Sequence, residues 1–185
     1  KSPYIVISRA SRMIEAAESG KLTDQSEAAS TISQYENEAK ALRGLALFDL
    51  VRIYGKPYTE DQGASLGVPV VTTSLQSTDK MSRNKVSECY NQILKDLNDA
   101  EKLLKESDPL DFFTDQTDED FIDKNHFLVN REFRMNLYAV KAMLARVYCY
   151  KGDAESKGLA TEYAKEVIAA SKYFTLYKSQ TASNY

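Results

Sequence analysis

The sequence predicts an all-α protein built from stacked helix pairs with long irregular loops. Five segments repeat apolar residues at the 3.6-residue period of an α-helix. Clusters of glycine, proline and polar residues separate these segments, as is typical of helix ends. The 185 residues lie within the usual size of one domain. We therefore expect residues 1–185 to form a single helical domain, either complete or part of a larger one.

Composition and charge argue against several classes of protein. No apolar run approaches the roughly 20 residues that a membrane-spanning helix needs. The net charge of −3 comes from 24 basic and 27 acidic side chains spread along the chain. Because nucleic-acid binding requires a concentrated basic surface, no nucleic-acid partner is expected.

The first two helices are predicted at residues 4–19 and 33–54. Gly20 follows the first as a C-terminal stop. Ser33 is the predicted N-cap of the second, because Glu36 three residues later completes an S-x-x-E capping box.

The second helix carries a predicted apolar stripe that includes one acidic residue. Its members are Leu42, Leu45, Ala46, Asp49, Leu50 and Ile53. An unpaired carboxylate among apolar neighbours is costly, so we predict a buried ion pair between Asp49 and either Arg52 or Arg146. The alternative is that Asp49 reaches solvent at the edge of the stripe.

Three further helices are predicted at residues 85–105, 133–150 and 159–172. The first of these has the clearest stripe, made of Val86, Cys89, Tyr90, Ile93, Leu97, Ala100 and Leu104. Helices 33–54 and 85–105 should form one antiparallel pair. Helices 133–150 and 159–172 should form a second pair that stacks on the first.

Two long connections are predicted, over residues 56–83 and 107–131. Connections of this length usually have a function or are disordered. The second is rich in acidic and aromatic residues.

The second predicted pair has the small residues typical of tetratricopeptide repeats, in which small side chains let adjacent helices approach closely. Residues 138–171 are the best candidate unit. The turn at residues 151–157 is longer than the strict 34-residue consensus allows, so the pattern alone leaves the repeat assignment open.

One run of the sequence resembles the signature of SusD/RagB proteins, which are outer-membrane nutrient-binding lipoproteins. The run is EAKALRGLALFDLVRIYGKP, at residues 38–57. Gly44 stands where the family usually has alanine, and Lys56 stands directly before Pro57 where a small apolar residue is typical. Further similar elements follow in the family's order, at residues 66–71, Arg83, residues 86–104, Arg134, Asn136, residues 142–153 and residues 174–176.

The resemblance implies a tetratricopeptide-like scaffold that docks on a SusC-like TonB-dependent outer-membrane transporter. Its loops would bind an oligosaccharide or, in the RagB branch, a peptide, and catalysis would be no part of its role. It also implies a lipid anchor at the cell surface, with the anchor cysteine outside this sequence. Because family members are markedly longer, this chain is expected to be a fragment. The alternative function is a generic tetratricopeptide module that binds a partner protein.

The residue types needed for catalysis or metal binding are not arranged in known patterns. His126 is the single histidine. The acidic run at residues 115–123 breaks the frame of a calcium-binding loop. Cys89 and Cys149 lie sixty residues apart and are predicted to be apolar core residues. We therefore expect no catalytic residue, metal or cofactor. A glycosidase would need carboxylates outside this chain.

Sugar rings are generally bound by stacking on aromatic side chains. The aromatic residues outside the predicted helix cores are Tyr54, Tyr58, Phe112, Phe113 and Phe121, which are the candidate ligand-binding residues. The alternative for each is that its ring fastens a loop to the scaffold. The absence of tryptophan argues that the main glycan platform lies elsewhere.

Overall fold

The described part of the chain is helical, which confirms the predicted all-α fold. The computed structural model describes residues 3–20, 22, 29–74, 80–107 and 134–171. Outside the helices, the described segments form one isolated antiparallel bridge, between Leu66 and Lys85. No described helix is both long and apolar enough to cross a bilayer. The helices are α1 (Pro3–Glu18), α2 (Ala29–Tyr54), α3 (Tyr58–Asp61), α4 (Val86–Ser107), α6 (Leu137–Lys151) and α7 (Ala154–Ala169).

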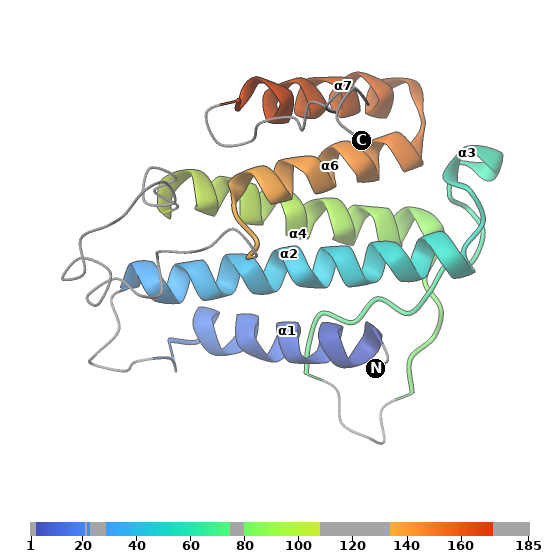
Figure 1. Cartoon of the computed structure of the whole chain (residues 1–185). Helices are drawn as coiled ribbons and strands as arrows, with labels where there is room; N and C mark the ends of the chain where they lie inside the picture. Colours follow the sequence, from blue (N-terminus) through green and yellow to red (C-terminus); the bar gives the residue numbers. More distant parts are fainter. Residues whose placement is uncertain (1–2, 21, 23–28, 75–79, 108–133, 172–185) are drawn as a thin grey trace, which may run out of the picture.

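The five long helices lie side by side in the order α1, α2, α4, α6 and α7, and each runs antiparallel to the next (Figure 1). Helix α2 pairs with α4, and α6 pairs with α7, so both predicted antiparallel pairs are confirmed. Contacts between α4 and α6 join the two pairs. Helix α1 covers the other side of α2.

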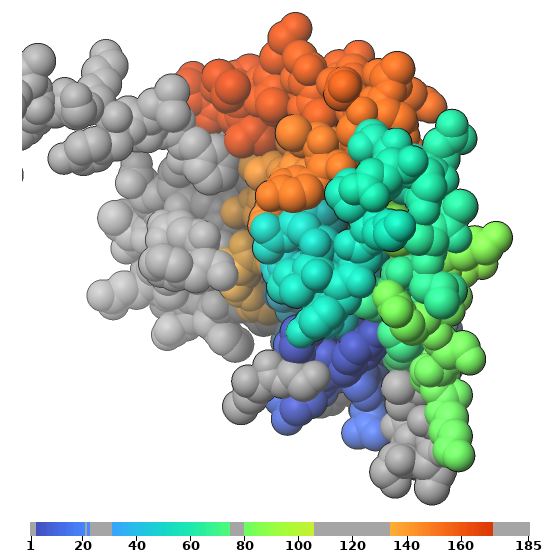
Figure 2. Space-filling view, turned by 90° about the vertical axis from the view of Figure 1, so that its right-hand side faces the viewer, coloured from blue at the N-terminus to red at the C-terminus, as the bar shows by residue number. Residues whose placement is uncertain are grey.

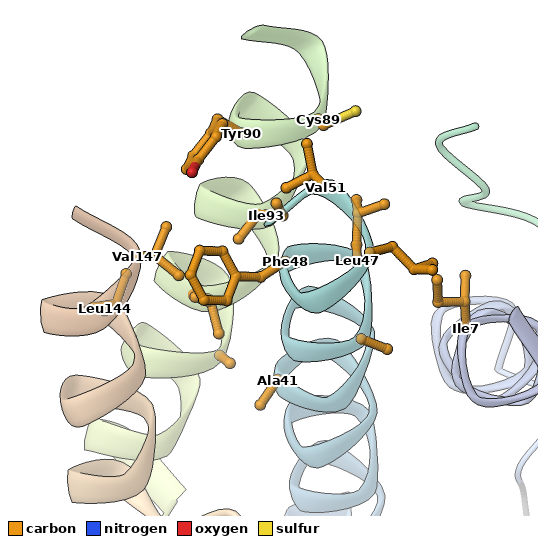
Figure 3. Packing of buried hydrophobic residues seen from close by; sticks show 14 of the residues in the cluster. Ile7, Ala41, Leu47, Phe48, Val51, Cys89, Tyr90, Ile93, Leu144 and Val147 are labelled. Atoms are coloured by element: carbon orange, nitrogen blue, oxygen red, sulfur yellow. The ribbon is translucent and has the colours of Figure 1, made fainter. Parts of the chain in front are cut away.

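The core lies along α4, and the stripe predicted for this helix is confirmed. Each of its seven members is at most 4% exposed. Phe48 of α2 projects between α4 and α6, where it meets Leu144 and Val147, while Leu47 points the other way to meet Ile7 of α1 (Figure 3). Helix α2 is therefore buried on two sides.

The stripe predicted for α2 is partly wrong, because Ala46 and Leu50 are buried but two other members are exposed. Leu42 is 40% exposed and Ile53 is 64% exposed. The buried positions instead include Ala41, Leu47 and Val51. A helix packed between α1 and α4 has apolar residues around most of its circumference. The spacing of its apolar residues therefore does not show which side of the helix faces solvent.

Three predicted helix starts also differ from the structure. Helix α2 begins at Ala29, so Ser33 lies inside the helix and does not cap it. Helix α6 begins at Leu137 because the Asn136 side chain accepts a hydrogen bond from the Ala139 N–H at 2.9 Å. Helix α7 begins at residue 154, five residues earlier than predicted. Within the predicted connection, the short helix α3 was not foreseen.

The early start of α7 has a cap as its cause. The Asp153 side chain accepts a hydrogen bond from the Ser156 N–H at 2.8 Å and also contacts the Lys151 ammonium. That contact, with the hydrogen bonds from Ser156, lowers the pKa of Asp153 to about 2. The carboxylate therefore stays ionised at the positive end of the helix dipole.

Tyrosine contacts hold α7 in place. The rings of Tyr148 in α6 and Tyr163 in α7 are stacked with centroids 6.0 Å apart. The Tyr163 hydroxyl donates a hydrogen bond to Glu101 of α4 at 2.9 Å. Burial, and then this carboxylate, raise the pKa of Tyr163.

Arg43 and Asp96 form a buried ion pair, which the sequence reasoning did not single out. Arg43 Nε lies 2.8 Å from Asp96 Oδ2, and Nη2 lies 2.7 Å from Oδ1. The two side chains are 6% and 1% exposed. Arg43 Nη1 donates to the Thr72 carbonyl at 3.0 Å and to Ser11 Oγ at 3.3 Å, and Gln92 donates to Asp96 Oδ1 at 2.9 Å. One guanidinium thus connects α1, α2, α4 and the segment after α3.

Removing one partner of this pair should strongly destabilise the protein. Asp96→Asn leaves the Arg43 charge buried without a counter-charge, and we expect a loss of about 3–5 kcal/mol in the free energy of unfolding. Asp49→Asn is the matched control: its side chain is 40% exposed, and a loss below about 1 kcal/mol is expected. Urea unfolding followed by circular dichroism measures both. Equal losses of unfolding free energy in the two variants would contradict the assignment of Arg43 and Asp96 as the buried ion pair.

Candidate ligand-binding site

A hollow at the end of α2 is the candidate ligand-binding site. Helix α2 stops at Tyr54, where the Gly55 N–H still bonds to the Val51 carbonyl at 2.8 Å and Pro57 follows. The chain then passes through α3 and returns along α4. Figure 2 shows this end of the molecule, where the start of α1, the end of α2 and the segments on either side of residue 75 come together.

The returning segment is held by backbone hydrogen bonds. The Gly67 N–H donates to the Asn84 carbonyl at 2.7 Å, and the Asn84 N–H donates to the Val68 carbonyl at 3.2 Å. The Val70 N–H donates to Asn84 Oδ1 at 2.9 Å. A Cβ at position 67 would lie 2.9 Å from the Cys89 sulfur, so glycine is required for this close approach to α4.

Arg83 fastens the returning segment to α2. Its Nε donates to the Gly67 carbonyl at 2.6 Å. Its Nη2 donates to the Leu66 carbonyl at 2.9 Å and reaches the Tyr54 carbonyl at 3.4 Å. The guanidinium is therefore fixed in position although its side chain lies at the surface.

The hollow has a volume of about 470 Å³. Tyr4 of α1 closes one side, and its hydroxyl donates to the Pro69 carbonyl at 3.1 Å. Burial raises the pKa of Tyr4, so this hydroxyl remains a donor at neutral pH. The described residues that line the hollow are Pro3, Tyr4, Leu50, Tyr54, Gly67, Val68, Pro69 and Arg83.

Tyr54 is the predicted ligand-binding residue that lines this hollow. It is 64% exposed, and its backbone is held at the end of a long helix. An exposed ring on a rigid element offers an apolar face at little cost in conformational entropy. Together with the nearby Arg83 cation, it has the composition of a small-molecule site, which combines apolar walls with a few fixed polar groups.

Tyr58 lies in a different environment. Its ring packs edge-on against Tyr90 with centroids 5.5 Å apart. Lys151 Nζ lies 4.7 Å from the Tyr58 ring centroid. Tyr58 therefore takes the alternative role foreseen for loop aromatics, that of fastening the loop. Phe112, Phe113 and Phe121 lie outside the described residues, as do His126 and the acidic run at residues 115–123.

Asp49 lies beside both of its predicted partners, but the predicted burial is wrong. Arg52 Nη2 is 3.2 Å from Asp49 Oδ1, and Arg146 Nη2 is 3.8 Å away. The Asp49, Arg52 and Arg146 side chains are 40%, 33% and 45% exposed. The arginines also lie over the rings of Tyr150 and Phe48, at 5.5 Å and 5.4 Å from the ring centroids. The cluster belongs to the surface because α2 presents this side to solvent.

Tyr4 and Arg83 were not singled out as site residues from the sequence. Arg83 matched the family pattern without an assigned role, and Tyr4 lay in a predicted helix with no special feature. No local signal marks either residue. The hollow joins residues near positions 4, 54, 68 and 83, which only tertiary packing brings together.

The two cysteines differ in environment. Cys89 is buried, its Sγ lies 3.4 Å from the Val68 carbonyl, and burial raises the pKa of its thiol. Cys149 is exposed, so the prediction that it is a core residue is wrong. Among the described residues, no group of three or more His, Cys, Asp or Glu side chains is placed to hold a metal ion.

Comparison with known proteins identifies the relatives of the chain. The model of the SusD-like family described as "starch-binding associating with outer membrane" matches residues 1–117. A SusD superfamily protein from Bacteroides thetaiotaomicron is 31% identical with a TM-score of 0.73, over 95% of this chain and 32% of that one. A SusD superfamily protein from Bacteroides vulgatus is 26% identical with a TM-score of 0.71, over 95% and 34%.

A laminarin-binding SusD-like protein is also similar, at 25% identity and a TM-score of 0.51, over 76% of this chain and 24% of that one. The chain therefore spans about a third or less of the length of these solved relatives. No curated protein sequence matches it significantly.

The two neighbouring tyrosines should respond differently to truncation. Tyr58→Ala removes a packed ring, and we expect a loss of about 2–3 kcal/mol in the free energy of unfolding. Tyr54→Ala removes an exposed ring, and a change below about 0.5 kcal/mol is expected. Urea unfolding of both variants provides the measurement. A larger loss for Tyr54→Ala would show that its ring supports the fold and is not free for a ligand.

Proposed function

The chain belongs to the SusD-like family, and on that basis we propose that it captures an oligosaccharide at the cell surface without catalysis and delivers it to a SusC-like TonB-dependent outer-membrane transporter. Family membership supports carbohydrate as the ligand class, as does the likeness to a laminarin-binding protein. The family's association with the outer membrane supports the location. Attachment there through a lipid anchor outside this sequence is part of the proposal.

The observation that carries the proposal is the hollow beside Tyr54. A sugar ring has apolar C–H faces and a rim of hydroxyls, so it binds to an aromatic face flanked by polar groups. Tyr54 supplies the face, and Arg83 supplies donors at the same corner. The backbone around both is fixed by hydrogen bonds, so little ordering entropy is lost on binding.

The lining of the hollow favours binding over chemical conversion. None of its described residues is a histidine, cysteine or carboxylate. Glycoside hydrolysis generally uses two carboxyl groups held about 5–10 Å apart. The described lining offers one exposed aromatic ring, that of Tyr54, and one permanent cation, which suit recognition.

Titration calorimetry of the full chain against laminarin and starch oligosaccharides tests the capture function. We expect saturable binding that Tyr54→Ala weakens at least about tenfold, which corresponds to about 1.4 kcal/mol. Tyr150→Ala is the matched control, because Tyr150 is 50% exposed but lies outside the hollow. The affinity of the Tyr150→Ala variant for the same oligosaccharides should stay within about twofold of wild type.

Two results would contradict the proposal. The first is the absence of binding to every glycan tested. The second is release of new reducing ends from a bound oligosaccharide, since that would make the protein an enzyme. Co-purification of the chain with a TonB-dependent transporter from outer-membrane extracts tests the delivery step separately.

A further inference from the structure

We propose that the hollow beside Tyr54 selects oligosaccharides that carry a carboxylate, as uronic acids do. This inference rests on the proposed function and specifies its ligand class. Three observations support this inference: the charge of Arg83, the absence of acidic residues in the described lining, and the hydrogen bonds that the surrounding main-chain carbonyls already accept.

Arg83 differs in its partners from four other described arginines. Arg43, Arg52, Arg134 and Arg146 each form an ion pair with a carboxylate at 3.8 Å or less. Within the described residues, Arg83 bonds only to main-chain carbonyl oxygens. Those bonds hold the guanidinium, and no carboxylate among the described residues forms an ion pair with it.

One donor group of Arg83 has no partner among the described residues. Nε and Nη2 make the three carbonyl contacts, whereas Nη1 bonds to no described residue. An arginine held in place with an unused N–H group is suited to a charge-assisted hydrogen bond with a carboxylate. Because its rotamer is already fixed, this bond forms without ordering a flexible side chain.

The cation and the aromatic ring line the same hollow. Arg83 Nη2 contacts the carbonyl of Tyr54 itself, which places the guanidinium next to the residue with the exposed ring. A sugar stacked on Tyr54 therefore brings its ring substituents close to Arg83. The volume of about 470 Å³ falls within the range of ordinary ligand pockets, about 300–1,000 Å³.

The local charge also favours an anion. The chain as a whole carries a net charge of −3, yet none of the eight described lining residues is acidic. An acidic ligand therefore meets a cation that no described carboxylate neutralises, in a hollow with apolar walls, where the attraction is screened less than in bulk water.

An acidic peptide is the less suitable ligand for this hollow. Peptides bound in an extended form need free main-chain partners along the site. Here the carbonyls of Leu66, Gly67 and Pro69 already accept hydrogen bonds from Arg83 and Tyr4. A glycan does not need hydrogen bonds to a series of main-chain groups. The Tyr54 ring and the Arg83 cation are therefore sufficient to bind it.

The decisive comparison uses two probes with the same sugar backbone, namely trigalacturonic acid and its fully methyl-esterified form, in which methyl groups remove the charge. Titration calorimetry of the full 185-residue chain at low ionic strength should show the acid binding at least about tenfold more tightly. Raising the salt concentration should reduce the affinity for the acid and leave that for the ester nearly unchanged. This comparison needs no variant and so does not depend on the folding of a mutant.

Three variants test whether Arg83 supplies the charge that is responsible. Arg83→Gln should lower the affinity for the acid to that for the ester, whereas Tyr54→Ala should weaken both probes by a similar factor. Arg83→Lys keeps the charge but loses the bonds to the three carbonyls, and it should retain part of the preference for the acid. Thermal unfolding of each variant checks that the fold is intact.

The possible failures are distinguishable. If the ester binds as tightly as the acid, or laminarin binds and the acid does not, the inference is wrong and the capture function stands. If no glycan binds, the capture function itself fails. If a glutamate-rich peptide binds as tightly as the acid, with the same dependence on Arg83, glycan selection is overturned in favour of a general carboxylate site.

Discussion

The buried pair of Arg43 and Asp96 is the constraint on which the arrangement of the first three long helices depends. Two charges removed from water are tolerated only when their geometry and remaining hydrogen bonds are nearly complete. Here completion requires Ser11 from α1, Gln92 from α4 and the carbonyl of Thr72 at the same time. Any slip of one helix along another would leave a charge unpaired, so the register of α1, α2 and α4 is fixed.

That register determines where the hollow forms. With α2 set against α4, Tyr54 ends beside the segment that precedes α4, and Arg83 can reach its carbonyl. The close packing of the two helices depends on small residues: a Cβ at Gly44 would lie 3.2 Å from Leu97 Cγ, which is fully buried. The rigidity of the ligand hollow is thus inherited from buried contacts between helices that lie outside it.

The sequence predicted the fold class, the helix order and the stripe of α4, because one-sided packing leaves an unambiguous apolar period. It misplaced the stripe of α2, because a helix buried on two sides has no single apolar phase. The same error assigned the buried charge to Asp49. Asp96, by contrast, lies between Ile93 and Leu97 on the well-defined stripe of α4. A carboxylate in that position requires a buried partner, so the correct charge pair left a signal in the sequence.

The ligand site was less predictable than the fold for a physical reason. Tyr54 and Tyr58 stand four residues apart around the same helix end, yet one ring is 64% exposed and the other packs on Tyr90. Their difference arises from the path of the segment after α3 and from Lys151, which comes from α6. Composition and spacing near residue 55 contain no information about either. A helical scaffold can therefore be predicted locally, whereas the surface it offers to a ligand depends on which distant segments its packing brings together.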